Sequence, residues 1–217
     1  MMVRILCLLI GYAFGLFQTS YIIGRMNGID IRSSGSGNAG TTNALRILGF
    51  KAGAVTFVCD ILKCIVAVII TYHLFKGSYG DIAPLLKIWT SAGVTLGHIF
   101  PFYMNFKGGK GIAAMGGMII AFWDPLLIAL GLLIFFGLVF LTHYASVASL
   151  ALILSFLFEI AIGNILGYYG MEPRFRVEMF VLVTLLTALA VYEHRNNILR
   201  LLQGTERKTY LTKKNEK

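Results

Sequence analysis

Long apolar runs with almost no charge are the feature of this sequence that most constrains its fold. They cover residues 3–23, 53–75, 83–104, 112–123, 126–142, 145–169 and 177–192. About 20 apolar helical residues cross a bilayer core, so the run at 112–123 is short for a full crossing. The runs are continuous and do not alternate as in an outer-membrane barrel. The pattern therefore predicts an all-α integral membrane protein with seven transmembrane helices.

Composition excludes the other broad classes. Of 217 residues, 57% are hydrophobic and 13% are charged, against about 45–50% and about 25% in soluble domains. We therefore expect residues 1–217 to form a single polytopic domain, with a tail at about 193–217 that lies at the membrane interface. The three cysteines lie in apolar runs without metal-ligand spacing, so we expect neither a metal nor a cofactor. The apolar N-terminus lacks a small-residue cleavage site and is interpreted as the first spanning helix.

Basic residues predict the orientation. The net charge is +9, and thirteen of the 19 Lys and Arg residues fall in segments 24–51 and 105–111 and in the tail. Five lie on the other side, and Lys63 lies within a span. Cytoplasmic loops carry the excess of Lys and Arg. We therefore predict that the N-terminus is outside and the C-terminus is cytoplasmic. The basic charge indicates topology and lipid headgroups, and no nucleic-acid partner is expected.

A glycine-rich polar segment at 33–43, followed by Arg46, is the first of three polar clusters on the predicted cytoplasmic side. Glycines allow backbone N–H groups to approach a ligand, and a helix that starts near Thr41 would point its N-terminus at a phosphate. An ordinary helix-capping loop remains the alternative. The candidate residues here are Ser36, Gly37, Asn38, Gly40, Thr42, Asn43 and Arg46.

The second and third clusters lie at two further helix ends. Lysines flank a Gly-Gly turn, which is typical of an anion site, although topology alone also demands lysines there. Residues 193–202 have the spacing of a short amphipathic interfacial helix, which would place His194, Asn197 and Arg200 on one face. The candidate residues of these two clusters are His98, Lys107, Gly108, Gly109, Lys110, Gly111, His194, Asn197, Arg200 and Glu206.

Asp60 and Lys63 lie inside the second apolar run, three residues apart. Ionisable residues in a membrane are costly and normally pair or face a polar site. Their spacing allows the two side chains to pair with each other. We therefore expect an intramembrane ion pair with a structural role.

Together, the stretches at 34–46, 97–111 and 194–206 resemble the bacterial membrane acyl-phosphate:glycerol-3-phosphate acyltransferases in sequence and in order. The resemblance implies seven transmembrane helices and an active site on the cytoplasmic face of the bacterial inner membrane. It implies transfer of a fatty acyl group from acyl phosphate to the 1-hydroxyl of sn-glycerol 3-phosphate. The products would be lysophosphatidic acid, the first intermediate of phospholipid synthesis, and phosphate. It also allows a transient contact with the enzyme that forms the acyl phosphate.

On this interpretation the catalytic residues are Ser36, Arg46, His98, Lys107, His194 and Asn197, and the other candidates bind substrate. Acyl phosphate is already activated, so direct attack on the acyl carbon needs mainly positioning and electrostatic stabilisation. The proton could pass to His98, to His194 or to a substrate phosphate oxygen. The sequence departs from the family pattern at Thr41, Cys64 and His143. His143 leaves open how the turn before Ser146 contributes to anion binding.

Two other classes fit part of the pattern. A transporter of an anionic or phosphorylated solute also needs cations and glycines, but near the bilayer midplane. Midplane charge is limited here to Asp60, Lys63 and Glu159. A non-catalytic subunit that binds anionic lipid would account for the basic tail but not for the glycine- and asparagine-rich loop.

Overall fold

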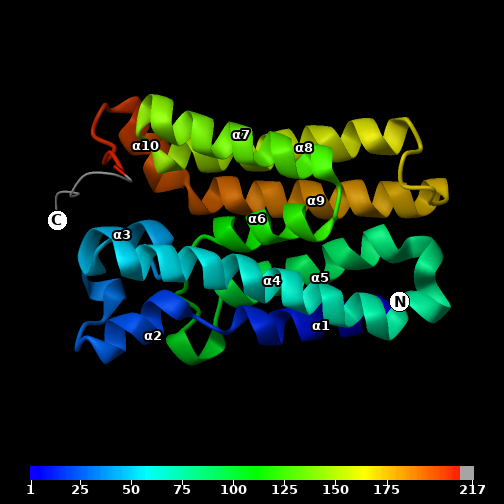
Figure 1. Cartoon of the computed structure of the whole chain (residues 1–217), viewed down its shortest axis with the longest axis horizontal. Coiled ribbons are helices and arrows are strands. Elements are labelled where there is room, and N and C mark those ends of the chain that lie inside the picture. Colours follow the sequence, from blue (N-terminus) through cyan, green and yellow to red (C-terminus); the bar gives the residue numbers. More distant parts are fainter. Residues whose placement is uncertain (211–217) are drawn as a thin grey trace.

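The computed structural model describes residues 1–210, and within that range it contains helices and no strands (Figure 1). The all-helical prediction is therefore confirmed for the described residues. The α-helices are α1 (Met2–Gly15), α2 (Thr19–Met26), α3 (Thr41–Leu48), α4 (Phe50–Tyr79), α5 (Ala83–Ile99), α6 (Ile112–Ala121), α7 (Pro125–Thr142), α8 (Ala145–Ile165), α9 (Pro173–Glu193) and α10 (Arg195–Leu202). Single 3₁₀ turns occur at η1 (Ile31–Ser33), η2 (Gly80–Ile82) and η3 (Phe102–Met104).

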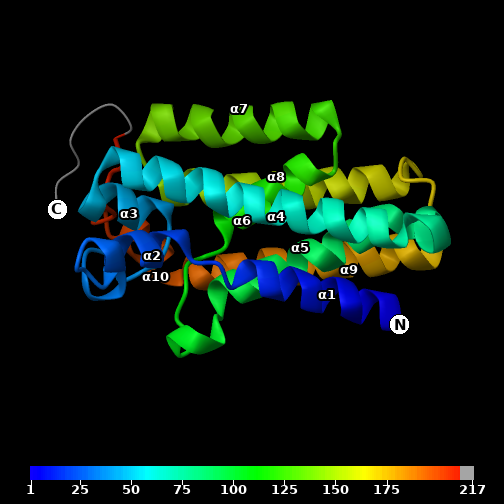
Figure 2. The same cartoon turned by 60° about the horizontal axis from the view of Figure 1, so that its bottom comes forward.

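The long helices lie side by side in an elongated bundle. The N-terminus lies at one end, and the short helices α2, α3 and α10 gather at the other (Figures 1 and 2). Five stretches are long and apolar enough to cross a membrane, and one of them, Phe50–Met104, contains both α4 and α5. Helix α6 has only ten residues, about 15 Å of helix at 1.5 Å per residue. The chain is therefore a multi-pass membrane protein.

The closest helix crossing joins α1 to α5 through glycines. A Cβ at Gly11 would lie 2.0 Å from the Thr90 carbonyl oxygen, and one at Gly97 would lie 2.3 Å from that of Tyr12. Gly15 and Gly93 are equally close to the facing backbone. Small residues let membrane helices approach this closely. The crossing fixes the C-terminal end of α5, which carries His98.

The prediction of one continuous helix over 3–23 is wrong, because the chain leaves helical geometry at residues 16–18. The buried Gln18 side chain turns back and donates to the carbonyls of Gly15, at 3.2 Å, and His98, at 3.0 Å. The freed Phe17 carbonyl accepts a hydrogen bond from Lys63 Nζ at 2.8 Å. Irregular backbone at membrane depth needs such internal partners. The break therefore connects α1–α2 to the C-terminal end of α5 and to the middle of α4.

Other boundaries differ by a few residues. Helix α4 extends three residues before and four after the predicted run, α5 stops at Ile99 before Pro101, and α8 stops at Ile165. The predicted helix start near Thr41 and the short helix within 193–202 are confirmed by α3 and α10. The last part of the predicted interfacial tail, with Lys213, Lys214 and Lys217, lies outside the described residues.

Three helices are joined by a polar cluster at the end of the bundle that carries the N-terminus. Glu178 on α9 accepts two hydrogen bonds from the Arg4 guanidinium of α1 and one, at 2.8 Å, from Trp89 Nε1 of α5. Bidentate arginine–carboxylate pairs are among the stronger polar contacts. This cluster holds α1, α5 and α9 together far from the polar helix ends at the other side.

Candidate active site

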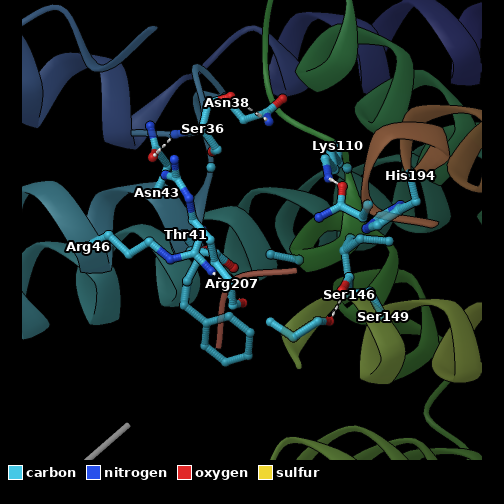
Figure 3. Close-up of a pocket in the computed structure, with 18 of the residues that line it drawn as sticks. Ser36, Asn38, Thr41, Asn43, Arg46, Lys110, Ser146, Ser149, His194 and Arg207 are labelled. Carbon is cyan, nitrogen blue, oxygen red and sulfur yellow. Dashed lines mark hydrogen bonds between the residues drawn. The ribbon is translucent and has the colours of Figure 1, made fainter. Parts of the chain in front are cut away.

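A cavity of about 290 Å³ opens where the three polar clusters meet. Figure 3 shows side chains from the glycine-rich loop and α3 on one side of the pocket. They face side chains from the loop before α6, from α8 and from the α9–α10 junction. The predicted site residues that line it are Ser36, Asn38, Gly40, Thr42, Asn43, Arg46, His98, Lys110, Gly111, His194, Asn197, Arg200 and Glu206. Segments up to about 170 residues apart in sequence therefore form one pocket.

Asn43 shapes the glycine-rich loop from inside. The buried Asn43 side chain accepts from the backbone N–H of Ser36 at 2.9 Å and donates to the carbonyls of Ile31, at 2.9 Å, and Ser34, at 3.0 Å. Gly35 has φ +63°, and a Cβ there would lie 2.3 Å from Asn43 Oδ1. The Asn43 amide therefore holds the loop in shape, and its predicted contact with substrate stays a prediction. The loop wraps around it and leaves Ser36 exposed at the pocket.

Arg46 on α3 reaches across the cavity to the segment after α10. We name residues 203–210 the C-terminal strap. Arg46 Nη2 donates to Thr209 Oγ1 at 2.9 Å and to the Arg207 carbonyl at 3.2 Å. Thr209 N–H in turn donates to the His143 carbonyl at 2.7 Å. The strap thus links α3 to the α7–α8 turn. His143 takes part in this link through its backbone carbonyl.

Glu206 is the centre of a hydrogen-bond network on the opposite wall. It accepts from Asn197 Nδ2 at 2.6 Å, Arg200 Nε at 2.7 Å and Ser146 Oγ at 2.9 Å. Burial alone would raise the pKa of Glu206, but these three donors hold it below the usual range of a glutamate. Asn197 Oδ1 meanwhile accepts a hydrogen bond from Lys110 Nζ. The network fixes the direction of the Asn197 amide.

Lys110 and Arg46 are cations without a carboxylate partner among the residues that the structure describes. The carboxylates near the pocket, Asp60 and Glu206, form ion pairs with Lys63 and Arg200 respectively. Within residues 1–210, none lies within 4.0 Å of Lys110 or Arg46. Burial lowers the pKa of Lys110 to about 8. Two half-buried cations facing one cavity form a site suited to an anion.

The pocket's two histidines hold their protons on different nitrogens. His194 Nδ1 lies 2.7 Å from the Ala190 carbonyl oxygen, which can only accept. His98 Nδ1 lies 2.8 Å from Lys63 Nζ, which can only donate. In the neutral rings, His194 therefore presents a free acceptor at Nε2, whereas His98 presents an N–H there. Burial, with the nearby charge of Lys110, lowers the pKa of His194 to about 4.

The predicted pairing of Asp60 with Lys63 is confirmed, and the pair supports the pocket. Lys63 Nζ lies 2.8 Å from Asp60 Oδ1 and contacts His98 Nδ1 and the Phe17 carbonyl. All three side chains are buried. Buried charges persist in membrane proteins when they are paired and hydrogen-bonded in this way. Lys63 thereby sets the proton position of His98.

Four predicted site residues do not line the cavity. Gly37 and Lys107 are exposed beside it, and Gly108 and Gly109 pack the α5–α6 loop on α5. Gly109 N–H donates to the His98 carbonyl at 3.1 Å, and a Cβ at Gly109 would lie 2.2 Å from His98 Nε2. Gly108 and Gly109 are therefore needed for close packing in this structure. The catalytic role of Lys107 and the substrate-binding roles of the three glycines stay predictions.

Several lining residues were not selected from the sequence. Ser146 and Ser149 project from the first turns of α8, Arg207 comes from the C-terminal strap, and Asp60 comes from α4. The serines stand three residues apart in an apolar run, a spacing that places both on one helix face. That spacing was the available signal. Thr41, Gly35, Phe57 and Phe135 also line the cavity.

The fold and the pocket together define a class: an α-helical integral membrane protein with a buried cationic pocket, built from helix ends, at one end of its bundle. A protein-family model described as glycerol-3-phosphate acyltransferase matches residues 5–204. The chain belongs to the glycerol-3-phosphate acyltransferase family, and the resemblance inferred from the three motifs is confirmed.

Relatives in two bacteria are similar over nearly the whole chain. The glycerol-3-phosphate acyltransferases of Bacillus velezensis and Bacillus subtilis are each 38% identical, over 204 and 209 residues, and each alignment covers 94% of this chain and 96% of the relative.

Two solved structures have the same fold. Both are crystal structures of PlsY (YgiH), an integral membrane glycerol 3-phosphate acyltransferase. The glycerol 3-phosphate form has a TM-score of 0.81 at 29% identity and covers 95% of this chain and 96% of that one. The lysophosphatidic acid form has a TM-score of 0.78 at 28% identity and covers 96% of each chain.

Proposed function

We propose that this protein transfers a fatty acyl group from acyl phosphate to the 1-hydroxyl of sn-glycerol 3-phosphate, giving lysophosphatidic acid and phosphate. Membership of the family supports the acceptor and the product. One structural observation carries the proposal further: the cationic pocket continues into an apolar groove. A site for a phosphorylated acyl donor needs both environments in contact.

The polar part suits two phosphate groups. The cations Arg46, Lys110 and Arg207 line it together with Ser36 and Asn38, which can donate hydrogen bonds. Charge-assisted hydrogen bonds of this kind are about twice as strong as neutral ones. We assign both phosphates to this pocket. Glu206 stays engaged with Asn197 and Arg200, so it does not repel them at close range.

The apolar part suits the acyl chain. The groove shares Phe57, Ile112, Ala113 and Phe135 with the polar pocket. From there it follows α6 and α7, with α4 and α8 completing its walls. We place the acyl carbon at this junction, where the phosphate would lie in the cationic pocket and the chain in the groove.

The chemistry that we propose is a direct transfer. The glycerol hydroxyl oxygen attacks the acyl carbon, the bond from that carbon to the phosphate oxygen breaks, and phosphate leaves. His98 presents an N–H at Nε2, so it can donate to an anion but cannot take the proton there. His194 offers an acceptor, but with a pKa of about 4 it is a weaker base than a phosphate monoester, whose second pKa is about 6. We therefore assign the proton to a substrate phosphate oxygen and a hydrogen bond from the hydroxyl to His194.

Phosphate release from purified protein in lipid or detergent tests the proposal. We expect phosphate release from palmitoyl phosphate only when glycerol 3-phosphate is present, and no release of free CoA thiol when palmitoyl-CoA replaces it as the donor. Lys110→Ala should abolish phosphate release. Lys107→Ala, at the other side of the Gly-Gly turn, is the matched variant, and it should abolish release as well if the exposed Lys107 has its predicted catalytic role. Absence of release from the folded protein would reject the enzyme and favour a transporter, for which uptake of labelled glycerol 3-phosphate into vesicles is the assay.

We also propose seven membrane helices, α1 and α4 to α9, with the N-terminus outside and the pocket at the cytoplasmic face of the bacterial inner membrane. The placement of the N-terminus opposite α10 in the bundle supports this orientation (Figure 1), as does the excess of basic residues near the pocket. On this proposal residues 1–217 form one domain, and a transient acyl-phosphate-forming partner would approach from the cytoplasm. Labelling of Gln203→Cys from outside intact cells would contradict the orientation.

A further inference from the structure

Helix α6 carries two adjacent glycines, and only one of them is explained by helix packing. A Cβ at Gly117 would lie 2.5 Å from the Ile61 carbonyl oxygen and 2.8 Å from Cys64 Cβ, so Gly117 is needed where α6 crosses α4. A Cβ at Gly116 would meet no atom within 4 Å beyond its chain neighbours and its own helix backbone. Gly116 lines the apolar groove. Its missing side chain therefore leaves space in the groove itself.

From these observations we infer that Gly116 determines which acyl chains the enzyme accepts, by keeping the groove open for a long chain. This inference rests on the proposed function, because it assumes that the groove holds the acyl chain of the donor. It concerns a specificity-determining position. Gly116 lies away from the cationic pocket that would hold the phosphates.

The groove runs along one face of α6. Its lining from this helix is Ile112, Ala113, Gly116, Ile119 and Ile120, the three- and four-residue spacing of one helix face. Helix α7 supplies the facing wall, which includes Ile128, Leu132 and Phe135. Figure 2 shows α7 at the edge of the bundle, where it packs against α8 and α6.

Gly116 lies partway along that path. It follows Ile112, which belongs to both the pocket and the groove, by four residues, a rise of about 6 Å. An acyl chain that starts at the junction passes Gly116 after its first few carbons. A butyryl chain ends before this level, whereas a palmitoyl chain continues beyond it.

A leucine at position 116 would occupy the groove at this level. A long chain would then have to bend out of the groove, which would displace its carbonyl carbon from the attacking hydroxyl. A misplacement of about 1 Å can cost about a hundredfold in rate. We expect Gly116→Leu to lower the ratio of kcat/KM for palmitoyl phosphate over butyryl phosphate at least about tenfold.

The ratio is the decisive readout, because both rates are measured on one preparation and the fraction of active enzyme cancels. Gly137→Leu is the matched control. Gly137 also lies on an apolar helix with no atom within 4 Å of a Cβ, but it does not line the groove. We expect this control to leave the ratio within about twofold of the wild type. Gly116→Ala, which adds one methyl group, should give an intermediate ratio and serves if the leucine variant does not fold.

The inference is overturned if the Gly116 variants keep the wild-type ratio, or if Gly137→Leu changes it equally. Failure of the proposed function would look different, since wild-type protein would then transfer neither butyryl nor palmitoyl groups from the acyl phosphates. A selective loss of palmitoyl transfer, with butyryl transfer intact, supports both the groove and the role of Gly116.

Discussion

Replacing Arg46 by lysine keeps one positive charge in the pocket but removes the planar set of donors that a guanidinium offers. In the structure, Nη2 of Arg46 is already engaged by the C-terminal strap, at 2.9 Å from Thr209 Oγ1 and 3.2 Å from the Arg207 carbonyl. The remaining donors can then bind a substrate phosphate while the strap stays in place. A lysine gathers its three donors at one nitrogen, so it lacks the spread of the guanidinium fork that lets one side chain hold the strap and a separate phosphate.

The expected magnitude follows from that division of donors. If the lysine stays with the strap, the phosphate loses a charge-assisted hydrogen bond, which contributes about 1.5–3 kcal/mol. Converted with RT of 0.59 kcal/mol, this is about a ten- to 150-fold loss in kcat/KM. Thr209→Val removes only the side-chain contact of the strap, because the Arg207 carbonyl still accepts from Arg46. We expect that variant to lose less than about threefold.

The assay is phosphate release with palmitoyl phosphate and glycerol 3-phosphate, varied separately. Arg46→Lys, Thr209→Val and the double variant should be compared, since a double-mutant cycle isolates the coupling between the two residues. If Arg46→Lys retained full kcat/KM, the guanidinium fork would not bind phosphate. If Thr209→Val were as damaging as Arg46→Lys, Arg46 would act mainly by holding the strap.

Three further predictions concern charge and packing. Activity should fall as the pH rises through about 8, because the pKa of Lys110 is lowered to about 8 and its charged form is lost above that value. Lys110→Arg should shift this fall to higher pH in a pH–rate profile, and an unmoved alkaline limb would exclude Lys110 as its source. Glu206→Gln places an amide against Arg200 Nε and should cost about 1–3 kcal/mol of stability, measured as a lower Tm in detergent; an unchanged Tm would contradict the network. Gly97→Ala, whose Cβ would lie 2.3 Å from the Tyr12 carbonyl oxygen, should cost about 1–3 kcal/mol through overpacking. Gly137→Ala, in open space, should be neutral or stabilising in the same melting experiment, and equal effects would refute the glycine-contact argument.

Much of the site could be predicted because its residues sit at helix ends. Apolar runs mark where helices cross the membrane, so the polar segments between them must gather at the two surfaces. The segments around Asn38, Lys110 and Asn197 fall on the same side by simple counting of spans. That topology makes their meeting possible, and the structure shows that they line one cavity. Helix α10 was also recognisable, since Ile198, Leu201 and Leu202 form one apolar face.

The remaining features depend on contacts that sequence periodicity does not contain. The break at residues 16–18 lies inside an apolar run and exists because Gln18 and Phe17 find partners on α5 and α4. The sequence does not show why a particular position is a glycine. In the structure, a side chain at Gly109 would collide with His98, whereas a side chain at Gly116 would enter open space. The groove itself arises from four helices whose order in space only the structure shows.

The distribution of charge suits the proposed binding of anions at the end of a membrane bundle. The two carboxylates that line the pocket are each paired with one cation, Asp60 with Lys63 and Glu206 with Arg200. These pairs orient the groups that face the cavity, since Lys63 sets the tautomer of His98 and Glu206 directs the amide of Asn197. Arg46 and Lys110 are then left to face the cavity with hydrogen bonds to neutral groups only. Their desolvation is costly, and a bound phosphate is the group that would offset it.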